Sequence, residues 1–331
     1  MVRKECPALK LLFCGLGQIA RRHIGLLQKL IPDVQITALR SAGKNPENLP
    51  GVQEVFSWSE ADKHSFDAAL ITSPTHQHIA QASECVKRGM PVFMEKPLGA
   101  SLEGLDDLLA VVEKKNLPVY VAYCFRFHPL VQEFKKRVSG LRILHSRASF
   151  SSYMPSWRTK KNYQNSYIVH HGQGGGVILD CSHEIDTLEF LFGEVSKITG
   201  TAGRVSGLTV DAEDYADMLV KHPQGTTPLH LDFFSRVTQR YVEVDTADTF
   251  YRMDLKDRKI ISGQGSTLKE EVFAFDPDIM YAEQLRYFFS HLEAKMPMMN
   301  NLADAARLLK VILNFRDCVE SGTGPKAWTC P

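Results

Sequence analysis

The feature that most constrains the fold is an alternation of short apolar runs with amphipathic stretches in the first third of the chain. These runs and stretches alternate at residues 9–14, 19–30, 34–39, 68–72, 78–88, 91–95, 101–115 and 118–123. Such alternation is typical of consecutive βαβ units, whose parallel sheet is covered by helices on both faces. Ser101 is the expected N-cap of the helix that runs to Lys115.

The pattern changes after Tyr123. Runs rich in Val, Thr, Phe and Tyr, with alternating polarity, lie at 141–153 and in pieces over 195–261, and they indicate antiparallel strands. Further helices are expected at 177–192, 281–295 and 302–319. The 331 residues are therefore divided into two predicted domains, 1–124 and 125–331, and the helix near 302–319 is a candidate to pack back on the first domain.

Composition excludes several classes of protein. The 39 Lys and Arg residues against 38 Asp and Glu residues leave a formal net charge of +1, which favours neither nucleic acid nor an acidic membrane surface as a partner. No apolar run approaches the roughly 20 residues of a membrane span. The seven cysteines are scattered without a C-x-x-C pair, so we expect reduced thiols, a cytoplasmic protein and no metal site.

A glycine motif lies between the first apolar run and the first helical pattern. Its sequence is Gly15-Leu-Gly17-Gln18-Ile19-Ala, which has the form G-x-G-x-x-A. Gly15 would permit a tight turn, and Gly17 would let the backbone approach a pyrophosphate at the helix N-terminus. The motif predicts a dinucleotide-binding site that includes Gln18 and Ile19, with a purely structural turn as the alternative.

The end of the second predicted strand bears on the choice of coenzyme. Arg40 and Ser41 stand where an acidic residue would normally bind the adenosine ribose. A guanidinium and a hydroxyl can bind a 2′-phosphate, so this position favours NADP over NAD. The alternative is that Arg40 is a solvated loop residue.

Two further segments follow predicted parallel strands, at the sheet edge where ligands of such folds bind. They place the cofactor-facing candidates at Thr72, Ser73, Pro74, His78, Glu95 and Lys96. His78 could equally be a partly buried structural histidine, with helix capping nearby at Thr75. Lys96 follows a strand directly, and Pro97 after it could adopt a cis peptide bond that aims the ammonium inward.

Four motifs in register resemble one known family. They are the G-x-G-x-x-A motif, Glu95-Lys-Pro97, the segment 123–129 and the segment 174–186, and together they resemble the glucose-fructose oxidoreductase and inositol dehydrogenase (Gfo/Idh/MocA) family. The resemblance implies an α/β protein with an N-terminal Rossmann domain and a C-terminal α/β domain that has an open, mostly antiparallel sheet. It also implies NAD(P)-dependent oxidation or reduction of sugars and cyclitols, and a homodimer or homotetramer formed through the second sheet.

His183 is the candidate proton-transfer residue. Residues 178, 181, 185, 188 and 192 share one apolar helical stripe, which places Asp180, His183 and Thr187 on the opposite face. The preceding triple glycine would allow close approach of a ligand or of the other domain, so we expect His183 to face a cleft. A neutral imidazole suits proton transfer near pH 7, and Lys96 would stabilise the negative charge that develops on the same oxygen.

Asp180 is expected to orient the imidazole or to bind a neighbouring substrate hydroxyl. The family usually has D-x-x-x-H, whereas this chain has D-x-x-H, which leaves the roles of Asp180 and Asp186 open. Further candidates are Arg126, Trp157 and Arg158 for the cofactor, and Tyr123 and Tyr163 for the substrate. Structural packing of Trp157 is an equal alternative.

The substrate class is narrowed only by resemblance. The Trp-Arg loop followed by D-x-S-H-E-I-D is similar to family members that act on surface-polysaccharide or sialic-acid-like sugars, so a sugar, sugar acid or nucleotide-sugar is expected. The alternatives are a cyclitol dehydrogenase, an imine-type reductase and a cofactor-binding regulator without catalysis.

Overall fold

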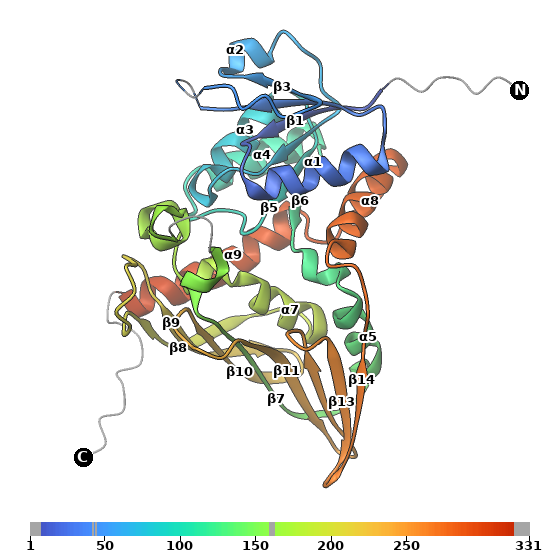
Figure 1. Cartoon of the computed structure of the whole chain (residues 1–331), viewed down its shortest axis with the longest axis vertical. Coiled ribbons are helices and arrows are strands. Elements are labelled where there is room, and N and C mark those ends of the chain that lie inside the picture. The colour runs from blue at the N-terminus through green and yellow to red at the C-terminus, as the bar shows by residue number, and fades with distance from the viewer. Residues whose placement is uncertain (1–7, 42, 44, 159–162, 321–331) are drawn as a thin grey trace, which may run out of the picture. The chain divides into compact units, whose positions relative to one another are not determined.

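The computed structural model describes residues 8–41, 43, 45–158 and 163–320, apart from the side chain of Arg158. The described residues form two compact units (Figure 1). The first contains the residues up to Ala122 together with Tyr281–Ala306, and the second contains Tyr123–Met280 together with the residues from Arg307 onward.

The first unit is built on a six-stranded parallel sheet with the order β3-β2-β1-β4-β5-β6. Its strands are β1 (Lys10–Cys14), β2 (Gln35–Leu39), β3 (Val52–Val55), β4 (Ala68–Ile71), β5 (Val92–Glu95) and β6 (Val119–Ala122). The central strands are almost fully buried because both faces of the sheet are covered, as expected of a doubly wound parallel sheet. The Rossmann-type fold predicted for this part of the chain is confirmed.

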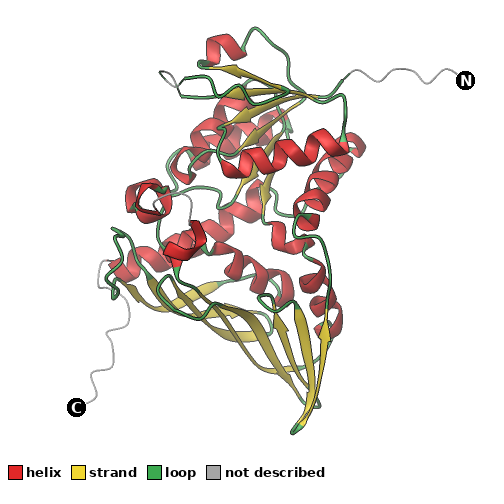
Figure 2. Cartoon of the chain, in the orientation of Figure 1, coloured by secondary structure: helices red, strands yellow, loops and turns green. Residues whose placement is uncertain are grey.

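Helices lie on both faces of this sheet (Figure 2). They are α1 (Gln18–Leu30), α2 (Trp58–Ala61), α3 (His78–Lys87), α4 (Leu105–Lys115) and most of α8 (Ile279–Ala294). The Phe93 ring contacts His23 of α1 and Phe288 of α8 on one face. On the opposite face, the Cys14 sulfur lies 4.0 Å from that of Cys85 on α3.

One local prediction in this unit was wrong, and two elements were missed. Ser101 is not the N-cap of α4, because residues 101–104 form a turn and the helix begins after Gly104, whose φ is +73°. The side chain of Ser101 instead accepts a hydrogen bond from the amide of Glu103. Strand β3 and the single-turn helix α2 were not predicted.

The second unit is built on an eight-stranded, mostly antiparallel sheet with the order β14-β13-β12-β11-β7-β10-β9-β8. Among the strand pairs that the structure describes here, only β7 and β10 run parallel. The strands are β7 (Ile143–Ser151), β8 (Lys197–Gly203), β9 (Tyr215–His222), β10 (Gly225–Asp232), β11 (Gln239–Thr246), β12 (Phe250–Asp254), β13 (Lys259–Gln264) and β14 (Thr267–Val272). This open sheet confirms the predicted class of the second part of the chain.

Of the described helices, α5 (Pro129–Val138), α6 (Val177–Asp180) and α7 (Ser182–Phe192) pack against this sheet. The last described helix, α9 (Leu302–Glu320), is shared between the two units. Short 3-10 turns are η1 (Thr75–Gln77) in the first unit and η2 (Cys124–Phe127), η3 (Met154–Arg158), η4 (Tyr163–Asn165), η5 (Tyr167–Val169) and η6 (His171–Gln173) in the second.

The single helix predicted over 177–192 is interrupted at Cys181. This residue has φ −94° and ψ 22°, outside regular α-helix geometry, and it separates α6 from α7. The predicted apolar stripe is buried on both sides of the break. Thr187, however, is also buried and donates a hydrogen bond to the carbonyl of His183, so it does not lie on an open polar face.

The buried side chain of His222 makes the stability of the second unit depend on pH. Its Nε2 contacts the hydroxyl of Thr227 at 2.7 Å, and its ring stacks on Phe192. Burial lowers the pKa of His222 to about 4. Because the unfolded chain takes up this proton near pH 6.5, the stability contributed by neutral His222 is present above that pH and is lost as the pH falls towards 4.

We therefore expect the His222→Gln variant to lose less stability than the parent chain between pH 7 and pH 4.5. The difference should be at most about 3 kcal/mol, because each shifted pKa unit is worth about 1.4 kcal/mol. Glutamine keeps an amide that can bond to Thr227 but does not titrate in this range. Urea unfolding at the two pH values measures the effect, and parallel losses in both proteins would contradict it.

Among the described residues, no helix is both long enough and apolar enough to cross a bilayer.

Candidate functional site

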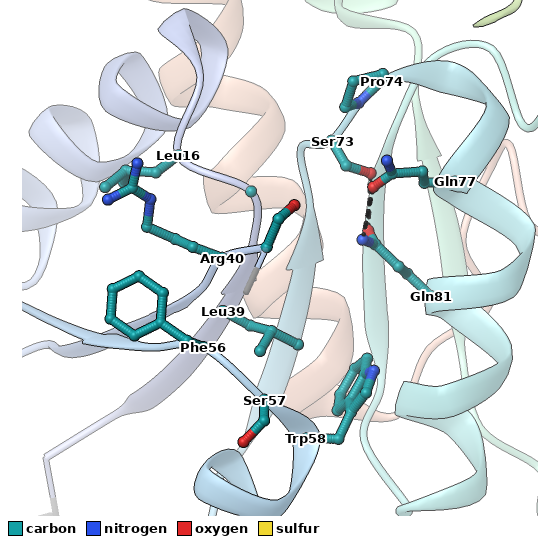
Figure 3. Close-up of a pocket in the computed structure, with 12 residues that line it drawn as sticks. Leu16, Leu39, Arg40, Phe56, Ser57, Trp58, Ser73, Pro74, Gln77 and Gln81 are labelled. Atoms are coloured by element: carbon teal, nitrogen blue, oxygen red, sulfur yellow. Dashed lines mark hydrogen bonds between the residues drawn. The ribbon is translucent and has the colours of Figure 1, made fainter. Parts of the chain in front are cut away.

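A cavity of about 410 Å³ lies at the carboxyl ends of the central strands of the first unit (Figure 3). Its walls come from the glycine motif, the end of β2, the segment after β3 and the segment after β4. The lining residues are Gly15, Leu16, Leu39, Arg40, Ser41, Phe56, Ser57, Trp58, Ser73, Pro74, Gln77 and Gln81. Five of these, Gly15, Arg40, Ser41, Ser73 and Pro74, were predicted from the sequence.

The glycine motif provides the features that a dinucleotide requires. Gly15 has φ +100°, and a β-carbon there would come within 3.2 Å of the backbone of Thr72 and Ser73. Gly17 is the N-cap residue of α1, and a β-carbon added to it would meet open space. Because no side chain caps α1 and no acid lies in its first turn, its N-terminal amides suit a pyrophosphate. The residues present therefore fit a dinucleotide.

Thr72 and His78 do not line the cavity, but their hydrogen bonds hold segments that do. The hydroxyl of Thr72 donates to the carbonyls of Cys14 and Gly15, which fixes the glycine turn against β4. The ring nitrogens of buried His78 lie 2.9 Å from the carbonyl of Ser73 and 2.8 Å from that of Pro97. Burial lowers the pKa of His78. His78 thus joins the segment after β4 to the segment after β5.

Arg40 reaches the cavity but is bound by acidic partners. Its guanidinium donates to Glu54 at 2.5 Å, to Glu47 at 2.7 Å and to the carbonyl of Asn45 at 2.8 Å. Only 11% of its side chain is exposed. Arg40 is therefore not the solvated loop residue of the alternative interpretation, and its charge is already matched by two carboxylates.

Glu95 is the last residue of β5, and Lys96 follows it at the carboxyl edge of the sheet. Glu95 accepts a hydrogen bond from Nε2 of fully buried His23 on α1 at 2.7 Å, which ties the glycine-motif helix to β5. Lys96 is partly buried, and the Lys96–Pro97 peptide bond is cis. Neither residue lines the cavity of Figure 3.

In the second unit, His183 is held by an aromatic and ionic cluster. Its imidazole stacks on the ring of Phe125 with centroids 4.6 Å apart, and it lies nearly perpendicular to the ring of Tyr123 with centroids 5.9 Å apart. The guanidinium of Arg240 lies 4.2 Å from the same Phe125 ring and donates to Glu184 at 2.6 Å. The rings of Tyr123 and Phe125 therefore orient the His183 ring, and Arg240 holds Phe125 in turn. Burial raises the pKa of Tyr123, so its hydroxyl stays protonated near neutral pH.

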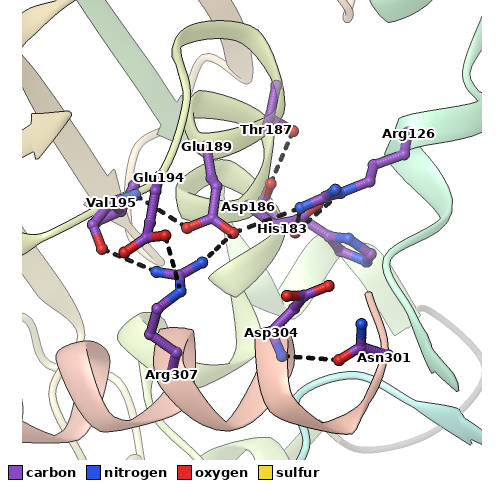
Figure 4. A network of polar contacts seen from close by, with 10 residues as sticks. All are labelled: Arg126, His183, Asp186, Thr187, Glu189, Glu194, Val195, Asn301, Asp304 and Arg307. Carbon is purple, nitrogen blue, oxygen red and sulfur yellow. Dashed lines mark hydrogen bonds and ion pairs between the residues drawn. The ribbon is translucent and has the colours of Figure 1, made fainter. Parts of the chain in front are cut away.

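Arg126 lies in a buried ion-pair network (Figure 4). Its guanidinium donates to both oxygens of fully buried Asp186, the shortest contact being 2.8 Å, and lies 3.6 Å from Glu189. Burial raises the pKa of Asp186, and the charge of Arg126 opposes that rise. Glu189 also binds Arg307 at 2.7 Å. This pairing gives Arg126 and Asp186 a structural role that the sequence did not indicate.

The triple glycine at 174–176 is explained by close packing inside the second unit. The sequence had predicted instead that it allows close approach of a ligand or of the other domain. A β-carbon on Gly175 would lie 2.4 Å from the carbonyl oxygen of Ile168, and one on Gly176 would lie 2.3 Å from the carboxylate of Glu213. Gly176 also has φ +99°. Both glycines are required by packing within the second unit, so they carry no evidence that His183 faces a cleft.

The remaining predicted contacts are distributed over the second unit. Trp157 donates to the hydroxyl of Ser152 at 2.7 Å and packs against Phe150 and Phe233, as its structural alternative predicted. The hydroxyl of Tyr163 accepts a hydrogen bond from the amide of Thr209. Asp180 is the last residue of α6 and is partly buried. The side chain of Arg158 lies outside the described residues.

Sequence comparison identifies the family. Residues 9–123 match the model of the oxidoreductase family with an NAD-binding Rossmann fold (GFO_IDH_MocA), and residues 142–248 match the C-terminal domain of the same family. The chain therefore belongs to the Gfo/Idh/MocA oxidoreductase family, as the four motifs predicted.

Individual relatives are distant. A scyllo-inositol 2-dehydrogenase (NAD(+)) from Bacillus subtilis is 24% identical over 56% of this chain and 55% of its own length. A 2,7-anhydro-N-acetylneuraminate hydratase from Mediterraneibacter gnavus is 22% identical over 49% of this chain and 43% of its own length. The chain thus matches about half the length of each. The solved structure of UDP-N-acetylglucosamine 3-dehydrogenase from Acidithiobacillus ferrooxidans has a TM-score of 0.76 at 18% identity and covers 96% of this chain and 99% of its own.

Proposed function

We propose that this protein transfers hydride between a nicotinamide coenzyme and a hydroxyl or carbonyl carbon of a sugar-like substrate. The observation that carries the proposal is the cavity beside Gly15 and Gly17, where the uncapped N-terminus of α1 suits a pyrophosphate. Membership of an oxidoreductase family supports it. The bound coenzyme would supply the hydride chemistry, and the protein would supply orientation and proton transfer.

Lys96 and His183 are the proposed proton-handling residues. Oxidation of an alcohol removes a proton from the hydroxyl as hydride leaves the carbon, and a neutral imidazole at His183 would accept it. The ammonium of Lys96 would bind the same oxygen and stabilise its negative charge. Asp180 would bind a neighbouring substrate hydroxyl, with Tyr123 and Tyr163 as further proposed substrate contacts.

The proposed substrate is a sugar, sugar acid or nucleotide-sugar, with sialic-acid-like compounds as the narrower choice. The relative named as a 2,7-anhydro-N-acetylneuraminate hydratase supports that choice, because its name describes an anhydro sialic acid. A cyclitol dehydrogenase is the second candidate, which the scyllo-inositol dehydrogenase from Bacillus subtilis favours.

The test is coenzyme absorbance in the presence of a substrate panel. NAD(H) or NADP(H) is supplied with sialic acids, nucleotide-sugars, aldoses and inositols, and reduction or oxidation of the nicotinamide is followed near neutral pH. Turnover with a sugar supports the proposal, and turnover confined to inositols supports the second candidate. Tight coenzyme binding without turnover on any compound would instead indicate a regulator.

We also propose that the second unit forms a homodimer or homotetramer through its sheet. The face opposite the helices carries a hollow of about 540 Å³, and Leu219, which lines this hollow, is 48% exposed. Light scattering of the purified chain should give a mass of two or four subunits. A monomer at micromolar concentration would contradict the proposal.

A further inference from the structure

Four side chains of alternating charge form a cluster that begins at Arg40, which follows β2 and lines the cavity. Arg40 binds Glu54 and Glu47, and Glu47 also binds Arg21 of α1. Two guanidinium groups thus face two carboxylates. This cluster has no excess of positive charge with which to attract a phosphate.

The two carboxylates differ in how firmly they are held. Glu54 has 6% of its side chain exposed, and its second oxygen accepts the amides of Glu47 and Asn48 at 2.7 and 2.8 Å. It is therefore a fixed partner of Arg40. Glu47 has 39% of its side chain exposed and is held by the two arginine side chains. An incoming anion can replace Glu47 at Arg40 but cannot replace Glu54 without leaving buried groups unpaired.

From this arrangement we propose that Glu47 is the residue that determines the choice between NAD and NADP. The inference rests on the proposed coenzyme binding. Arg40 lines the cavity, and Glu47 occupies the guanidinium face that a 2′-phosphate would use. A ribose with a free 2′-hydroxyl leaves the Arg21–Glu47–Arg40 bridge intact. A 2′-phosphate must displace a carboxylate and then lie beside it, which costs binding free energy because like charges repel.

The sequence prediction of NADP preference considered Arg40 and Ser41 without the acidic residues that bind Arg40. An arginine attracts a phosphate only with the part of its charge that is not matched by neighbours. Substitution of Arg40 is a poor test of coenzyme choice, because it would leave the buried carboxylate of Glu54 without its cationic partner and so lower the stability of the fold. Glu47 can be neutralised without burying an unpaired group, so Glu47→Gln isolates the effect on coenzyme choice.

The experiment measures the dissociation constants of NADH and NADPH by coenzyme fluorescence, for the parent chain and for Glu47→Gln. We expect the variant to bind NADPH roughly tenfold more tightly, while its affinity for NADH changes less than about twofold. Raising the salt concentration should reduce the difference between parent and variant, because the interacting charges are partly exposed.

The matched control is Glu133→Gln. Glu133 is also a partly exposed glutamate bound to an arginine, Arg137 at 2.8 Å, but it lies on α5 in the second unit. In Glu133→Gln, the ratio of the NADPH and NADH dissociation constants should equal that of the parent chain. If Glu47→Gln leaves the ratio of the two dissociation constants unchanged, or raises the affinity for both coenzymes equally, the assignment of Glu47 is overturned. Coenzyme binding itself would still be established by these measurements. Failure of every variant to bind either coenzyme would overturn the proposed function as well.

Discussion

Replacing Lys96 by alanine is expected to lower turnover at least ~100-fold while the affinity for the coenzyme stays close to that of the parent chain. The size is that of a lost charge that stabilises a developing oxyanion. Lys96 follows β5 at the carboxyl edge of the parallel sheet, and it does not line the cavity of Figure 3. Its removal should therefore affect the chemical step more than coenzyme binding.

The measurement is single-turnover absorbance at saturating coenzyme, with a separate fluorescence titration for affinity. The matched control is Lys87→Ala, since Lys87 on α3 is 58% exposed and its ammonium binds the neighbouring Glu84. Added methylammonium should restore part of the rate of Lys96→Ala and none in the control. Near-normal turnover in Lys96→Ala would remove this residue from the mechanism.

Most of the first unit could be predicted because its signals are local. The apolar runs and the glycine motif each act over a few neighbouring residues. Strand β3 was missed because only Val55 of its four residues is buried, so the run lacks the apolar pattern of a central strand. The break at Cys181 was missed because the buried stripe continues at 3 and 4 residue steps through it.

Only some of the residues that line the cavity could be predicted, because only those have a local sequence signal. Gly15, Arg40, Ser41, Ser73 and Pro74 belong to motifs or to the ends of predicted strands. Trp58 and its neighbours on the segment after β3 were missed together with that strand. One local signal was available, since Ser57 caps α2 by accepting the amide of Glu60.

The ionic partners could not be predicted because they are distant in sequence. Arg126 meets Asp186 across 60 positions, and His23 meets Glu95 across 72. A charged residue in a sequence motif can bind a ligand or a buried neighbour, and only the fold decides between the two. The same reasoning changed the interpretation of Arg40, whose partner Glu54 lies on a strand that was not predicted.

Replacing His183 by alanine should also lower turnover at least ~100-fold, which is the usual contribution of a positioned general base. The imidazole is held flat against Phe125, and Phe125 is in turn contacted by Arg240, which is itself held by Glu184. Such positioning reduces the rotational freedom that a proton acceptor would otherwise lose in the transition state. The coenzyme cavity lies in the other unit, so coenzyme affinity should change little.

Because alanine also removes the contact with Phe125, a second variant, His183→Asn, keeps a planar side chain without a proton acceptor of imidazole basicity. Both variants should lose turnover, and added imidazole should restore part of the rate of His183→Ala. The control is His64→Ala, whose exposed imidazole lies before β4, at the opposite edge of the sheet from the glycine motif. If His183→Ala unfolds at the temperature of the parent chain and still turns over substrate at a similar rate, the base must be another residue.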